Sequence, residues 1–130
     1  MLAVDTNVIV RYLVRDDRGQ AERTDDLIRN NRIWITKTVL LETEWVLRDT
    51  YSIERQRIAN LLRAVAGITT VQVEDEVEVA SALDWFAAGM DFADALHLAS
   101  SARALEFATF DRKFVAKAAR LTPFRMLALR

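Results

Sequence analysis

Short apolar runs alternate along the chain with longer segments in which apolar residues recur every three or four positions. Runs such as 33–35 and 107–109 have the length of buried strands, whereas the longer segments have helical spacing. Strands that alternate with helices form a mostly parallel sheet with helices on both faces. The pattern therefore predicts an α/β fold, a three-layer α/β/α sandwich with a mostly parallel central sheet.

The same pattern predicts where the elements lie. We expect strands at 2–4, 33–35, 69–73 and 107–109 and an edge strand at 124–129, with helices at 8–14, 17–29, 38–49, 53–66, 74–88, 91–105 and 111–119. Asp17 is the expected N-cap of the second helix, and the acids at 74–76 are expected at the positive end of the helix that they open. No repeat or linker interrupts the chain, so its 130 residues are expected to form a single domain, 1–130.

Composition excludes several classes of protein. Hydrophobic residues make up 52% and charged residues 28%, which argues against a disordered chain. Three glycines and one proline are too few for a sandwich built on many tight turns. The absence of cysteine excludes disulfides, thiolate zinc sites and a cysteine nucleophile. One histidine, His97, argues against a histidine metal site or a Ser-His-Asp triad; packing is its simpler role.

The sequence gives no signal for a membrane or for export. No apolar run approaches the ~18 residues of a membrane span, and the first residues lack the basic start of a secretory signal. We therefore expect a cytoplasmic protein.

Charge is unevenly distributed although the net charge is only −1. Residues 112–130 contain six bases and no acid. Such a segment can bind nucleic acid locally, and its alternative role is a solvated helix face. Arg112, Lys113 and Lys117, which follow Asp111, are the candidates for contacts with nucleic-acid phosphates.

Certain acids lie where acids are unusual. Asp5 and Asp111 each follow a predicted strand, at the sheet edge where open α/β sheets place their sites. Glu42 has the apolar neighbours Val39, Trp45 and Val46 at helical spacing, which predicts an inward carboxylate in need of a partner. Glu44, by contrast, lies four residues before Arg48 and is expected to be an ordinary surface acid.

Two more acids share the start of one helix, since Asp94 follows Asp91 by three residues. Helix capping is the simpler role for Asp91, and Asp5 or Asp111, taken singly, could also be a cap. Together, the carboxylates would repel one another unless a cation offsets them. Oxygen ligands suit Mg²⁺ or Mn²⁺, and such an ion can activate water and stabilise an in-line phosphoryl displacement.

Four motifs in this order resemble the PIN-domain family, in particular the VapC-type endoribonuclease toxins. They are Ala3-Val4-Asp5-Thr6-Asn7-Val8, Leu41-Glu42-Thr43-Glu44-Trp45-Val46-Leu47, Asp91-Phe92-Ala93-Asp94-Ala95-Leu96 and Thr109-Phe110-Asp111-Arg112-Lys113-Phe114. Each motif alone is weak, but all four in order span nearly the whole chain.

The resemblance implies a metal-dependent endoribonuclease, the toxin of a toxin–antitoxin module. Its catalytic and metal-binding acids would be Asp5, Glu42, Asp94 and Asp111, with Asp91 a further candidate. Its cofactor would be Mg²⁺ or Mn²⁺, and its partners would be an RNA substrate, a cognate antitoxin and a second copy of the chain in a homodimer. Thr6, Asn7 and Thr109 would orient ligands or water.

Three alternatives remain. A haloacid-dehalogenase-type enzyme needs an aspartate two residues after Asp5, where this chain has Asn7. A receiver domain needs an aspartate after a middle strand, and 35–37 supplies none. The third is a catalytically inactive, dimeric binding module with the same fold, against which the complete set of acids argues.

Overall fold

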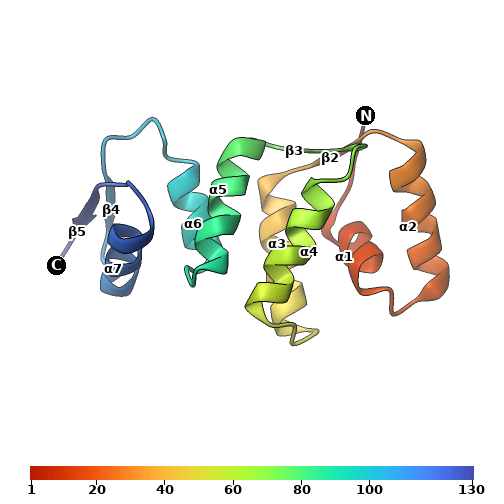
Figure 1. The fold of residues 1–130 in the computed structure, drawn as a ribbon, viewed down its shortest axis with the longest axis horizontal. Coiled ribbons are helices and arrows are strands. Elements are labelled where there is room, and N and C mark those ends of the chain that lie inside the picture. Colours follow the sequence, from red (N-terminus) through yellow and green to blue (C-terminus); the bar gives the residue numbers. More distant parts are fainter. The chain divides into compact units, whose positions relative to one another are not determined.

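A computed structural model describes residues 1–130 and divides them into two compact units, Met1–Glu76 and Val77–Arg130. Figure 1 labels the elements of both units. We describe each unit by itself. Every strand pairing in both units is parallel, and seven helices accompany the strands. The predicted α/β class with parallel strands is therefore confirmed.

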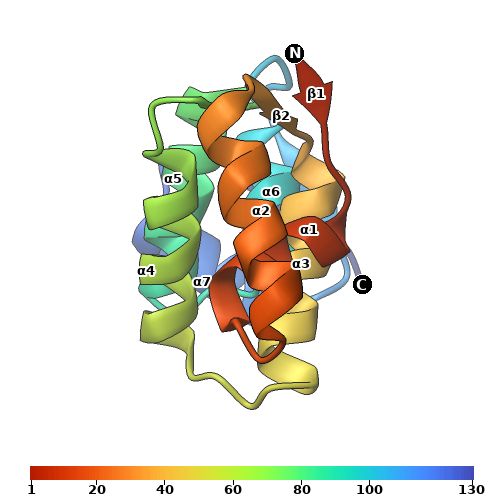
Figure 2. The same cartoon turned by 90° about the vertical axis from the view of Figure 1, so that its right-hand side faces the viewer.

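The first unit is built on a three-stranded sheet in the order β1-β2-β3. Its strands are β1 (Leu2–Ala3), β2 (Ile33–Ile35) and β3 (Val71–Val73), with β1 at the edge beside β2, as Figure 2 shows. Its helices are α1 (Thr6–Val14), α2 (Arg18–Asn30), α3 (Lys37–Asp49) and α4 (Arg55–Ala66). In β2 the flanking isoleucines are fully buried and Trp34 is half-buried, so both faces of the central strand are covered.

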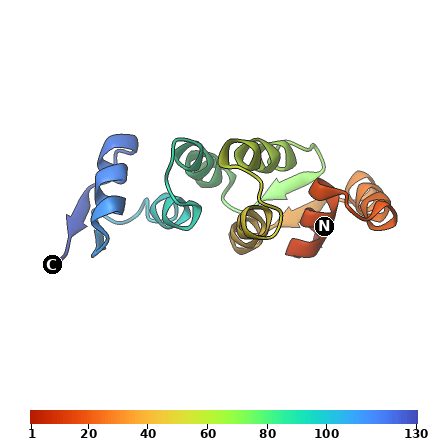
Figure 3. The same ribbon diagram turned by 90° about the horizontal axis from the view of Figure 1, so that it is seen from below.

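The second unit holds a two-stranded parallel sheet, β4 (Phe107–Thr109) with β5 (Met126–Ala128). Its helices are α5 (Glu76–Ala87), which starts at the unit boundary, α6 (Phe92–Ala99) and α7 (Arg112–Leu121). Helix α7 packs against both strands, and Figure 3 shows it alongside β5. Phe86 and Phe92 join α5 to α6 with ring centroids 5.2 Å apart. No helix of either unit is long and apolar enough to cross a bilayer.

The predicted helix at 91–105 is too long, because α6 ends at Ala99. The helical stripe holds for Ala95 and Leu98, which are fully buried, but Leu105 is 92% exposed. The Ser101 hydroxyl donates a 2.6 Å hydrogen bond to the His97 carbonyl. Side chains of this kind compete with the helical pattern for backbone groups, which favours an end to the helix at the serines.

The acids at 74–76 do not all serve the helix that follows them. Glu74 Oε1 accepts a 2.9 Å hydrogen bond from the Lys37 backbone N–H, and Asp75 pairs with Lys37 Nζ at 2.8 Å. Helix α5 begins only at Glu76. Two of the three acids thus lie at the start of α3, where negative charge also complements the helix dipole.

The predicted contrast between Glu42 and Glu44 is wrong as regards burial. Glu44 is only 2% exposed, whereas Glu42 is exposed on the surface of its unit. The predicted pair of Glu44 with Arg48 does form, at 2.8 Å from Nε to Oε2, but only the arginine reaches solvent. Spacing along one helix identifies the partner correctly, yet the packing of α3 in its unit decides which acid lies inside.

Glu44→Gln should therefore lower the free energy of unfolding of the protein. A hydrogen bond to a charged group contributes about 1.5–3 kcal/mol, and the amide loses the charge that pairs with Arg48. Glu42→Gln should change stability by less than about 0.5 kcal/mol, as exposed substitutions usually do. Urea unfolding of both variants measures the difference, and equal midpoints would contradict the buried placement of Glu44.

Candidate functional site

Asp5 lies two residues beyond β1 and is the N-cap of α1. Its Oδ1 accepts a 3.3 Å hydrogen bond from the Val8 backbone N–H. An aspartate is favoured there because it satisfies one of the free N–H groups of the first turn. Capping uses one carboxylate oxygen and leaves the other available to a ligand. The capping role considered for Asp5 is therefore real, and it is compatible with a second role.

Glu42 is held by a hydroxyl from another helix. Thr6, buried in the first turn of α1, donates a hydrogen bond to Glu42 Oε1 on α3. The contact joins residues 36 positions apart, which is why no partner at helical spacing was visible in the sequence. It brings the Glu42 carboxylate to the beginning of α1, where Asp5 also lies.

The second unit repeats the use of aspartate at a helix start. Asp91 caps α6, with Oδ2 accepting a 3.1 Å hydrogen bond from the Asp94 N–H. Asp111 caps α7, with Oδ1 accepting a 3.0 Å hydrogen bond from the Phe114 N–H. The Thr109 hydroxyl at the end of β4 accepts a 3.0 Å hydrogen bond from the Asp111 N–H. The backbone that carries Asp111 is thus fixed on both sides.

Asp94 is the residue whose electrostatic environment is most unusual. Partial burial raises the pKa of its carboxyl group above the usual value, and the nearby charges of Asp91 and Asp111 raise it further. His97 and Lys117 oppose this rise. The carboxylates of α6 and α7 therefore lie close enough to repel.

The other predicted site residues of the second unit differ in their contacts. His97 is exposed, so the packing role expected for it is wrong. Lys117 Nζ donates a 2.8 Å hydrogen bond to the Gly89 carbonyl and so ties α7 to the turn after α5. Arg112 and Lys113 are exposed in the first turn of α7. These two remain available to a phosphate, whereas Lys117 has a structural partner.

Each unit thus gathers part of the predicted set. In the first unit Thr6, the residue that follows Asp5 in the chain, donates to Glu42, and in the second Asp94 lies near Asp91 and Asp111. No three acidic or histidine side chains lie together in the arrangement that holds a metal ion. All of the grouped side chains supply oxygen, the donor type preferred by Mg²⁺ and Mn²⁺.

Comparison with protein families assigns the chain to a class. The model of the PIN domain matches residues 2–120, so the chain belongs to the PIN domain family. The seven helices and parallel strands agree with the α/β/α fold of this family. PIN domains are generally nucleases that use divalent metal ions and are common in toxin–antitoxin systems. No curated protein and no solved structure matched the chain.

The repulsion among the acids of the second unit has a measurable consequence. Asp111→Asn should lower the pKa of Asp94 towards its ordinary value of 3.8, because it removes one negative charge and keeps a capping side chain. NMR titration of the Asp94 carboxyl group measures this change. Glu106→Gln, at an exposed acid of the same unit that pairs with Arg125, is the control and should leave the pKa of Asp94 unchanged.

The raised pKa also sets a pH dependence of stability. The folded protein binds the Asp94 proton more tightly than the unfolded chain, so the free energy of unfolding falls as the pH rises from 3.8 through the raised pKa. Asp94→Asn should flatten this part of the stability curve. A curve of the same slope in the variant, measured by urea unfolding, would contradict the assignment.

Proposed function

We propose that this protein is an endoribonuclease that uses Mg²⁺ or Mn²⁺ and acts as the toxin of a toxin–antitoxin module. The observation that carries the proposal is the match to the PIN domain over residues 2–120. The grouping of Asp94 with Asp91 and Asp111, whose charges together with burial raise the pKa of Asp94, supports it. Repulsion between carboxylates in the folded protein supports this proposal, because a bound cation would offset it.

The residues fit a divalent metal ion in the chemistry of their donors. The proposed ligands are Asp5, Glu42, Asp94 and Asp111, and Asp91 is a fifth candidate. Three of these acids cap helices through one oxygen and keep a second oxygen for an ion. When bound, the metal ion would supply an activated water and neutralise negative charge on the phosphate.

The side chains around the acids have supporting roles in the proposed reaction. The Thr6 hydroxyl fixes the orientation of the Glu42 carboxylate, and Thr109 fixes the backbone of Asp111. Such partners limit the movement of a ligand and set its basicity. Arg112 and Lys113, exposed next to Asp111, would bind RNA phosphates and neutralise their charge. Lys117 would act through its charge, which lowers the pKa of Asp94.

The proposed function also includes a single-domain organisation of the chain, a homodimer and a protein partner. The family match runs through both units, from residue 2 to residue 120, which supports a single PIN domain over 1–130. In the proposed module the protein is a homodimer in the cytoplasm, and a cognate antitoxin protein blocks its site. These assignments follow the VapC-type resemblance of the motifs around the acids.

Asp5→Asn should abolish cleavage of single-stranded RNA in the presence of Mn²⁺. We expect a loss of about a hundredfold or more, since changing even the partners of metal ligands costs about 10–100-fold. Asp17→Asn is the matched control, because Asp17 caps α2 through Oδ1 in the same way but is not a proposed ligand. Cleavage by the folded Asp5→Asn protein at the rate of the control would refute the assignment.

The two glutamates of α3 should separate activity from stability. Glu42→Gln should reduce cleavage severely and leave the melting temperature nearly unchanged. Glu44→Gln should lower the melting temperature. At a temperature where the variant stays folded, it should retain most of the wild-type rate of RNA cleavage. The reverse result in a paired cleavage and melting experiment would exclude Glu42 as a ligand.

Metal binding should raise the stability of the wild-type protein. Binding to the folded state alone contributes ~2.7 kcal/mol at about a hundredfold excess over Kd. Asp94→Asn and Asp111→Asn should raise the melting temperature without metal and reduce the shift that Mn²⁺ produces. Scanning fluorimetry with EDTA or Mn²⁺ tests both effects. Full metal shifts in both variants would leave the four-acid pocket without support, and the absence of any metal shift in the wild type would favour an inactive binding module.

A further inference from the structure

A cavity lies between α1 and α2, and none of the acids that the proposed mechanism uses lines it. It has a volume of about 310 Å³ and is lined by Asn7, Val8, Arg11, Gln20, Arg23 and Thr24. Two arginines and two side-chain amides therefore face it, and no acid does. A volume near 300 Å³ is at the lower end of the range for ligand sites.

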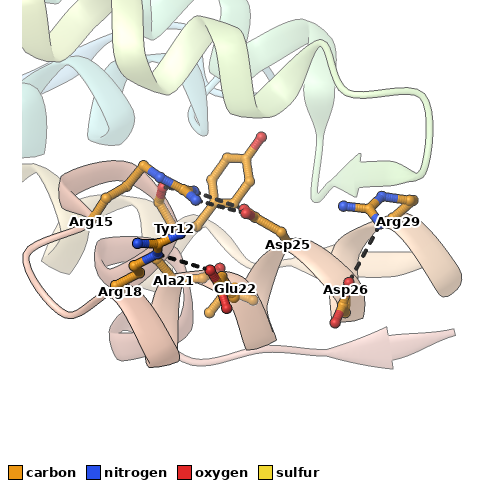
Figure 4. Close-up of polar contacts among 9 residues, drawn as sticks. Tyr12, Arg15, Arg18, Ala21, Glu22, Asp25, Asp26 and Arg29 are labelled. Atoms are coloured by element: carbon orange, nitrogen blue, oxygen red, sulfur yellow. Dashed lines mark hydrogen bonds and ion pairs between the residues drawn. The ribbon is translucent and has the colours of Figure 1, made fainter.

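The arginines of the two helices differ in whether an acid neutralises them. Figure 4 shows the acids of α2 in ion pairs: Asp25 with Arg15 at 2.7 Å, Glu22 with Arg18 at 3.1 Å and Asp26 with Arg29 at 3.4 Å. The paired charge keeps the pKa of Asp25 below its usual value. Every acid of α2 thus forms an ion pair with an arginine other than Arg23.

Arg23 is exposed and has no hydrogen bond or ion pair in the structure. Arg11, opposite it on α1, is held in place through a single nitrogen. Its Nη1 donates to Asp16 at 3.0 Å and to the Tyr51 hydroxyl at 3.3 Å. The Nε and Nη2 atoms of Arg11 remain available, so the cavity presents one anchored and one free guanidinium group. Two such groups are suited to an anionic oxygen ligand.

The cavity is also connected to the proposed metal ligands. Asn7 and Val8 belong to the first turn of α1, and the Val8 N–H is the group that Asp5 caps. The phosphates of a nucleic-acid strand bound at Asp5 would therefore reach the cavity about one helical turn further along α1.

We propose that this cavity is a subsite for the sugar–phosphate backbone of single-stranded RNA, and that Arg23 and Arg11 bind a phosphodiester group next to the one that is cleaved. The proposal rests on the proposed ribonuclease function and identifies where the substrate strand runs. Asn7 and Gln20 supply amide donors and acceptors for the ribose hydroxyls. Because the arginines contact the backbone, the subsite contributes affinity without sequence preference.

The test measures RNA binding by the protein in EDTA, where no cleavage occurs. Fluorescence anisotropy of labelled oligouridine and oligoadenine is the readout. Arg23→Gln should weaken binding of both RNAs by about fivefold and reduce the slope of log K against log salt by about 0.7, the value for one phosphate contact of a single strand. Arg23→Lys should keep the salt slope, because its charge is retained.

Arg18→Gln is the matched control, since Arg18 lies on the same helix, is exposed and does not line the cavity. It should leave the slope unchanged. Equal slopes for Arg23→Gln and Arg18→Gln, or no RNA binding by the wild type, would overturn the subsite. Wild-type cleavage in Mn²⁺, measured on the same protein preparation without EDTA, is the separate test of the nuclease. RNA binding that depends on Arg23 without any cleavage would support the subsite and refute the proposed function.

Discussion

The free N–H groups at the start of a helix are the constraint on which the candidate site depends. A helix leaves its first N–H groups without partners inside the helix, and a carboxylate satisfies them while also meeting the positive end of the helix dipole. In this protein Asp5, Asp91 and Asp111 occupy such positions at the starts of α1, α6 and α7. Two of these helices, α1 and α7, directly follow parallel strands. The preference for aspartate as an N-cap therefore also places negative charge at the junctions between strands and helices.

That concentration has opposite effects on stability and on chemistry. Each capping carboxylate stabilises its own helix, whereas the charges of Asp91 and Asp111 raise the pKa of Asp94 and disfavour its ionised form. Hydroxyl groups limit the movement of these acids: Thr6 donates to Glu42, and Thr109 accepts from the backbone of Asp111. In the proposed function a cation would offset this repulsion between the carboxylates.

On α2 in the first unit, acids are paired with arginines, whereas the acids around Asp94 in the second unit repel one another. The acids of α2 are matched with arginines, and one of these pairs, Arg15 with Asp25, joins α1 to α2 through two hydrogen bonds of 2.8 and 2.7 Å. Exposed pairs of this kind contribute little to stability. Their more important effect is on the distribution of charge, because they leave Arg23 as the unneutralised arginine beside the cavity.

Local pattern is enough to predict the succession of parallel strands and helices, the caps at Asp17 and Asp111, and the family, because periodicity, capping and motif order are properties of short segments. The burial of Glu44 and the exposure of Glu42 depend on tertiary packing, since both residues lie on α3 and the direction in which that helix packs is not encoded in spacing. The same holds for Thr6 with Glu42 and for Glu74 with Lys37, pairs that are 36 and 37 residues apart. Contacts over such separations depend on how whole elements pack, and therefore they cannot be derived from local pattern.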